Sequence, residues 1–184
     1  ANQLILNHSF GPSELAIYGF SFQVIMMIRL LQTQVLRLVA PSIAQLTEKV
    51  SENPVLVKKK LLQYCSLNFL LSAVIIAPAY VFAPYLIETF IGETYMGAVE
   101  VLNILFIWSL LFGIAIIINQ FLIGLRLQMF FFISTTVFGL LSILLAVLFT
   151  AQYKAAGAAV SLLTAHFCSV VFQLIIVLRK IGKE

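Results

Sequence analysis

The sequence predicts an all-α membrane protein, a polytopic helix bundle, and three observations support this fold class. Hydrophobic residues make up 62% of the 184 residues and charged residues only 10%, whereas soluble domains average about 45–50% and about 25%. The charged residues are spaced so that long uncharged runs lie between them. These runs are continuous rather than alternating, which favours helices over the strands of a membrane barrel.

The uncharged runs have the length of bilayer crossings, since one crossing needs about 20 mostly apolar residues. Four runs of 24 to 27 residues predict spans at about 62–86, 100–124, 128–151 and 156–178. A fifth span is predicted at about 13–40, with Ser13 as its cap and Glu14 near its positive end. Pro41 is expected to mark the exit of this span, and residues 1–10 are expected to be the tail of another helix.

Basic residues predict the orientation, because cytoplasmic loops are enriched in Lys and Arg. Eight of them fall after alternate spans, on one predicted side: Lys49, Lys58, Lys59, Lys60, Arg126, Arg179, Lys180 and Lys183. The other side has only Lys154 among several glutamates. The carboxy terminus is therefore expected to be cytoplasmic. The net charge of +4 is interpreted as an orientation signal for a chain in contact with membrane lipids, not as a nucleic-acid surface.

A stripe of polar residues on the first span is the main candidate site. Arg29 lies deep within the span, where an arginine costs about 2.5 kcal/mol or more unless it faces water or a partner. Thr33 and Arg37 follow at four-residue steps, and Tyr18 extends the same stripe outward. We interpret the stripe as the cationic wall of a hydrated cavity for an anionic substrate. The alternative is that the arginines extend to the cytoplasmic surface.

Three further polar residues are candidates for the same cavity. Asn119 and Gln120 lie toward the cytoplasmic end of the span at 100–124, and His166 lies within the last span. Each residue has a structural alternative, which is hydrogen bonding to a neighbouring helix.

The residues argue against an enzyme. The chain has no aspartate, and no glutamate lies in the middle of a predicted span. Metal-assisted diphosphate chemistry needs hard oxygen ligands, so we expect no catalytic residue, metal or cofactor. Cys65 and Cys168 are isolated in the sequence and form no metal motif.

Four segments resemble a known family when they are taken in order. They are GPSELAIYGF, LVAPSIAQL, FIGETYMGAVEVLNILFIW and YKAAGAAVSLLTA. Their order and spacing resemble the polysaccharide flippases of the multidrug/oligosaccharidyl-lipid/polysaccharide exporter superfamily, in particular the carboxy-terminal half of an O-antigen-type flippase. The matching residues are Gly11, Tyr18, Pro41, Gly92, Tyr95, Ala98, Leu102, Gly157, Ala158 and Ala159.

The resemblance implies a two-lobed transporter with about six helices in each lobe. Residues 1–184 would form the carboxy-terminal lobe, with the amino-terminal lobe absent. The implied function is translocation of lipid-linked oligosaccharide repeat units for cell-surface polysaccharide, such as the O-antigen of lipopolysaccharide, across the bacterial cytoplasmic (inner) membrane by alternating access. The implied partners are an undecaprenyl-pyrophosphate-linked glycan, the missing lobe and other polysaccharide assembly proteins.

Two alternatives remain open at this point. A multidrug exporter of the same superfamily would need carboxylates that favour cations, whereas this chain offers arginines within its spans. A non-transporting truncated or assembly subunit would need only surfaces that pack against partners.

Overall fold

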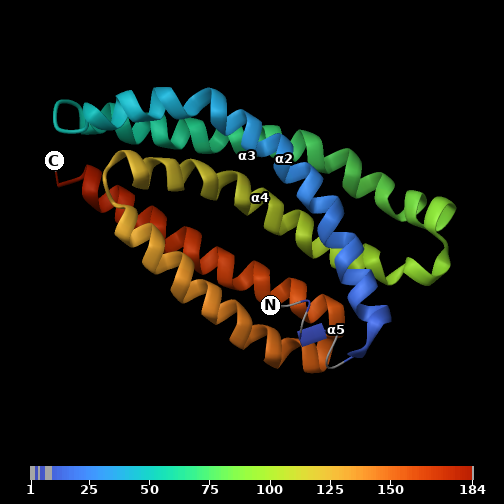
Figure 1. Ribbon diagram of the computed structural model, residues 1–184. Helices are drawn as coiled ribbons and strands as arrows, with labels where there is room; N and C mark the ends of the chain where they lie inside the picture. Colours follow the sequence, from blue (N-terminus) through green and yellow to red (C-terminus); the bar gives the residue numbers. More distant parts are fainter. Residues whose placement is uncertain (1–2, 4, 7–9, 184) are drawn as a thin grey trace.

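The computed structural model describes residues 3, 5–6 and 10–183, and all its regular elements in these ranges are helical (Figure 1). Four long α-helices and two short helical segments follow one another along the chain: α2 (Pro12–Glu48), α3 (Pro54–Leu86), η1 (Ile87–Ile91), η2 (Glu93–Tyr95), α4 (Gly97–Gly124) and α5 (Gln128–Ile181). Each of the four α-helices, α3 together with η1, is long and apolar enough to cross a membrane. The all-α fold class is confirmed for the described residues. The predicted helix tail at 1–10 lies largely outside them.

Helix α4 is the centre of the bundle. In its most apolar stretch 61% of the residues are buried, compared with 17–22% in the other three long helices. One core cluster joins the first half of α4, around Leu105, to Ile25 of α2 and Ala158 of α5. A second cluster joins its second half, around Phe121, to Leu61 of α3 and other helices. The other helices turn their exposed apolar side chains outward, as expected of a surface that faces lipid.

A polar joint inside the bundle links α2, α3 and α4 by hydrogen bonds. It consists of the side chains of Gln32, Asn68, Ser72 and Ser109. The Gln32 amide nitrogen donates to the Ser72 hydroxyl at 2.9 Å and to the Ser109 carbonyl at 3.0 Å. The Asn68 amide nitrogen donates to the Gly113 carbonyl of α4. All four side chains are almost fully buried. Hydrogen bonds of this kind hold helices together where lipid supplies no hydrophobic driving force between them.

Helix α4 approaches its neighbours closely at two glycines. A Cβ atom on Gly113 would lie 2.6 Å from the Ser72 hydroxyl oxygen, and one on Gly124 would overlap the Thr47 side chain. Small residues permit this approach of one backbone to another helix.

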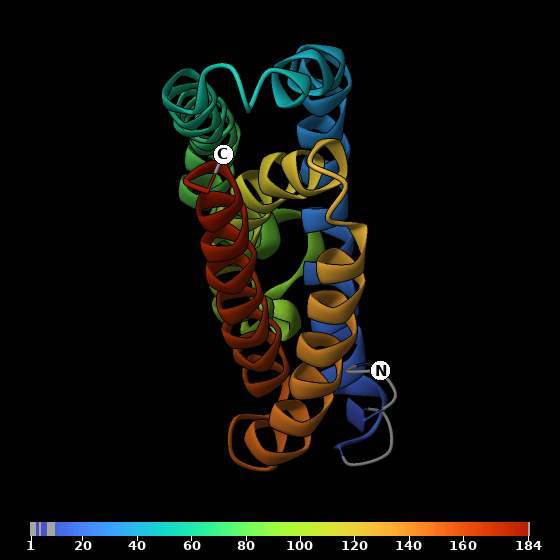
Figure 2. The ribbon, with the colours of Figure 1, turned by 90° about the vertical axis from the view of Figure 1, so that its left-hand side faces the viewer.

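Helix α5 is a hairpin of two arms. Lys154 has φ 47° and ψ −126°, so the helix is broken there. The arms lie side by side and run in opposite directions (Figures 1 and 2). The Gln173 amide donates to the Ser134 hydroxyl at 2.7 Å, and the rings of Phe138 and Phe172 are 5.9 Å apart, both across the hairpin. The break falls between the spans predicted at 128–151 and 156–178.

The first two long helices extend further than the predicted spans. Helix α2 continues through Pro41, the predicted exit of its span, and ends at Glu48. Proline removes one backbone donor, but neighbouring groups can compensate for this in a membrane helix. Helix α3 begins at Pro54 rather than near residue 62, with Asn53 as its cap, and continues through Pro78.

The basic turns lie together at one end of the bundle. Figure 1 shows the α2–α3 turn, the α4–α5 turn and the carboxy terminus at this end. The start of α2, the η1–η2 segment and the apex of α5 lie at the opposite end. The helices therefore bring together the three regions that the sequence grouped by charge.

Candidate functional site

Arg29 of α2 lies against aromatic rings of α4. Its guanidinium carbon is 3.7 Å from the ring centre of Phe112 and 4.9 Å from that of Trp108. One of its terminal nitrogens donates to the Met26 sulfur at 3.5 Å. Trp108 and Phe112 are one helical turn apart, so both rings face the same groove beside α2. The guanidinium is thus oriented by ring faces.

No carboxylate forms an ion pair with Arg29 in the described part of the chain, where Glu14 pairs with Lys154 instead. Contact with aromatic faces contributes about 0.5–2 kcal/mol. The cost of placing an arginine at the centre of a membrane is about 2.5–3.5 kcal/mol even on the lowest scales. The aromatic contacts therefore offset only part of this cost, and the charge of Arg29 has no counterion among the described residues.

His166 of the second α5 arm packs on the same two aromatic rings. Its ring centre is 5.8 Å from that of Trp108, edge to face, and 6.2 Å from that of Phe112, nearly parallel. Arg29 and His166 were predicted separately from different spans. The structure places both against one aromatic pair.

A pocket of about 390 Å³ lies beside this group, between α2, α4 and both arms of α5. Arg29, Asn119 and His166 line it, and each has a buried polar atom without a hydrogen-bond partner in the described structure: Nε, Oδ1 and Nε2 respectively. Such atoms cost about 1–3 kcal/mol each unless water or a ligand pairs with them. The pocket is therefore lined by three polar side chains with buried atoms that lack hydrogen-bond partners, among mostly apolar neighbours.

Two wider hollows adjoin this pocket. One, of about 540 Å³, lies between Tyr18 and Phe22 of α2 and the arms of α5, and shares Ser142 and Leu162 with the Arg29 pocket. The other, of about 600 Å³, runs along α2 from Phe22 past Arg29 to Thr33. Tyr18 is buried, and its ring stacks on Phe22 at 5.8 Å.

Two predicted residues lie away from these hollows. Arg37 is exposed and donates to the Gln34 side chain at 3.2 Å. Gln120 is half-buried and lines none of the three hollows. A four-residue step advances slightly more than one turn of 3.6 residues, so the stripe that includes Arg29 rotates away from the pocket by Arg37.

The sequence interpretation did not single out Trp108, Phe112 and Gln173 as site residues. The aromatic pair lies in the most apolar span, and Gln173 belongs to a stripe that also fits helix packing. Their four-residue spacing predicts that both rings lie on one face of α4. Only the packing of the helices shows that this face contacts Arg29. With respect to known proteins, no protein-family model, curated protein or solved structure matches this chain.

The lining of the pocket and of the two hollows can make polar and apolar contacts with a ligand. It offers one cation, hydrogen-bonding amides and hydroxyls, and apolar walls. The lining contains no carboxylate or thiol in the described residues.

Proposed function

We propose that this chain forms one lobe of a two-lobed transporter that moves lipid-linked oligosaccharide repeat units across a bacterial cytoplasmic membrane. The anionic group recognised would be the pyrophosphate of an undecaprenyl-linked glycan. Transport would proceed by alternating access, in which a cavity opens to one side of the membrane at a time. The proposal combines the family resemblance in the sequence with the Arg29 pocket.

The uncompensated charge of Arg29 is the observation that carries the proposal. A guanidinium presents several donors in a fixed plane, which suits phosphate oxygens. Asn119, Thr135 and Gln173 line the same pocket and offer hydrogen bonds to sugar hydroxyls. A cationic drug would be repelled by Arg29 and would find no carboxylate in this pocket, so the multidrug alternative is less favoured.

We further propose five crossings, with each arm of α5 counted separately. Under this topology the two basic turns, α2–α3 and α4–α5, face the cytoplasm, in agreement with the positive-inside rule. The carboxy terminus, which follows Arg179 and Lys180, would then also be cytoplasmic. The grouping of the basic turns at one end of the bundle supports this orientation (Figure 1).

Trp108 gives a direct test of binding, because it is the single tryptophan of the chain and lies beside Arg29. The membrane-embedded protein is titrated with an undecaprenyl-pyrophosphate-linked glycan while Trp108 fluorescence is recorded. We expect a saturable change whose midpoint rises about 10- to 100-fold in Arg29→Ala, because a hydrogen bond to a charged group contributes about 1.5–3 kcal/mol. Arg29→Lys should recover part of this affinity.

Arg37→Ala is the matched control, since it removes the same charge from an exposed position of the same helix. Its titration should follow that of the unmodified protein. The free polyprenol, which lacks the pyrophosphate, should give no saturable change. Equal affinity in Arg29→Ala, or tight binding of a cationic drug that Arg29→Ala leaves unchanged, would contradict the proposal.

A further inference from the structure

Helix α2 and the α5 hairpin form opposite walls of the hollow that leads to the Arg29 pocket. Helix α2 packs mainly on α4 and makes far fewer contacts with α5. Tyr18 and Phe22 on one wall are separated from Ser142 and Ile143 on the other by the hollow of about 540 Å³. The walls are thus apart where these residues line the hollow.

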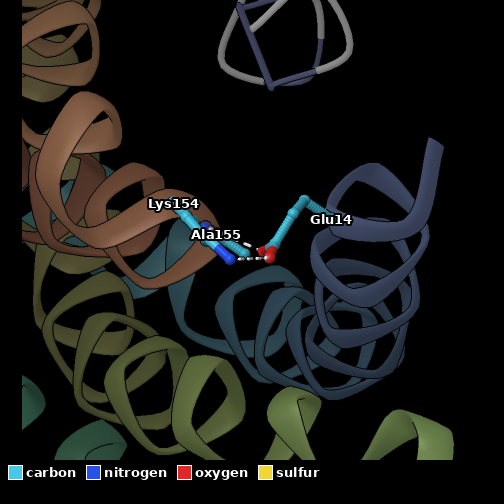
Figure 3. Close-up of polar contacts among 3 residues, drawn as sticks. All are labelled: Glu14, Lys154 and Ala155. Carbon is cyan, nitrogen blue, oxygen red and sulfur yellow. Dashed lines mark hydrogen bonds and ion pairs between the residues drawn. The ribbon is translucent and has the colours of Figure 1, made fainter. Parts of the chain in front are cut away.

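Glu14 connects the walls at the end of the bundle away from the basic turns (Figure 3). One of its carboxylate oxygens is 3.2 Å from the Lys154 ammonium nitrogen. The other accepts a hydrogen bond from the Ala155 backbone N–H at 3.4 Å. Glu14 lies one turn before Tyr18 on α2, so the contact borders the hollow.

The local backbone explains why a carboxylate binds at this point. The break at Lys154 leaves Ala155 at the start of the second α5 arm, where the first N–H groups of a helix have no partner within the helix. The positive end of that arm also favours an anion. Glu14 therefore caps the arm that carries His166, although 141 residues separate Glu14 from Ala155 in the chain.

We propose that Glu14 is a gating residue: its contact with Lys154 and Ala155 holds the two walls together at this end, and release of the contact opens the Arg29 pocket to the aqueous phase on that side. This inference rests on the proposed transport function, for which access to the pocket must change. The inference goes beyond that function by naming the contact that closes the pocket at this end.

The contact has the properties of a reversible closure. The Lys154 side chain is 60% exposed and that of Glu14 is 19% exposed, and ion pairs at such positions contribute little net stability. Helix α2 and the start of the second arm belong to one core cluster that is centred on α4, so each wall stays anchored to α4 when the contact is lost. Loss of the contact can therefore separate the walls without unfolding the bundle.

Thiol labelling tests the gate without any transport assay. Cys65 and Cys168 are replaced by Ala, and Ser142→Cys places a reporter that lines both the outer hollow and the Arg29 pocket. A membrane-impermeant maleimide is added to vesicles from the side of Glu14. We expect Glu14→Gln and Lys154→Gln to raise the labelling rate about two- to fivefold, the range that a partly exposed ion pair can supply.

Charge exchange separates gating from a general loss of structure. The double variant Glu14→Lys, Lys154→Glu restores the ion pair but not the hydrogen bond from the Ala155 N–H, so it should bring the labelling rate part of the way back toward that of the unmodified gate. Glu100→Gln is the matched control, since Glu100 is an exposed acid in the first turn of α4, and it should leave labelling unchanged. Unchanged labelling in both single variants, or a double variant that labels as fast as they do, would overturn the gate. These outcomes do not depend on glycan binding, so they are distinguishable from failure of the proposed function.

Discussion

The guanidinium carbon of Arg29 lies 3.7 Å from the ring centre of Phe112, on a different helix. This contact keeps a cation within the bundle without neutralising it. An acidic partner would have cancelled the charge that an anionic substrate needs, whereas an aromatic face leaves it available.

Replacement of Phe112 tests this relationship. Phe112→Leu keeps an apolar side chain but removes the ring, so we expect the protein to lose about 0.5–2 kcal/mol of stability. Glycan affinity, measured through Trp108 fluorescence, should also fall because Arg29 loses its fixed orientation. Phe132→Leu changes an exposed ring on α5 and should alter neither quantity; equal effects of the two substitutions would count against a specific role for Phe112.

The polar joint predicts that replacement of Gln32 lowers the stability of the bundle. Gln32→Leu conserves much of the volume but removes the bonds to Ser72 and Ser109. Interhelical hydrogen bonds in membranes contribute about 0.6–2 kcal/mol, so the midpoint of thermal unfolding in detergent should fall accordingly. Gln34→Leu on the exposed side of α2 serves as the control, and a similar fall there would show that the joint is not important.

The close approach of Gly113 to Ser72 predicts that a side chain at position 113 is destabilising and that a smaller residue at position 72 relieves the effect. Gly113→Ala places a Cβ atom 2.6 Å from the Ser72 hydroxyl oxygen, and overpacking of this kind typically costs about 1–3 kcal/mol. In a Ser72→Ala background the same substitution should cost less, because the obstructing oxygen is gone. Gly139→Ala, where the added atom meets nothing within 4 Å, should be tolerated. Additive effects of Gly113→Ala and Ser72→Ala would refute the steric explanation.

The five-crossing topology predicts a labelling pattern. Single cysteines replace Ser51 in the α2–α3 turn and Gln128 at the start of α5, and also Thr94 in η2 and Gln152 just before the break at Lys154. An impermeant thiol reagent should reach the first pair from the cytoplasmic side and the second pair from the outer side. If Gln128 and Gln152 label from the same side, α5 is not two crossings.

The pattern of charges predicted most of the local structure correctly. The break at Lys154 falls where the sequence separated two spans, and α4 ends at Gly124 as expected. Helix α2 continues past Pro41, the predicted exit of the first span, because a proline removes a single donor and the flanking helix can continue around it. Phe112 was missed because nothing in an apolar run shows which neighbour a ring will meet.

The sequence by itself determined the helices and their grouping by charge. The apolar runs require backbone bonds within each segment, and the scarce charges indicate where the apolar part of each segment ends. Tertiary structure decided which side chains share a space: Arg29 with Phe112 and His166, and Glu14 with Lys154. Arg37 was placed outside the pocket for the same reason, since helical phase and the packing of α2 on α4 turn it toward the surface. These relationships join residues far apart in the chain, and only the packing of the helices brings them together.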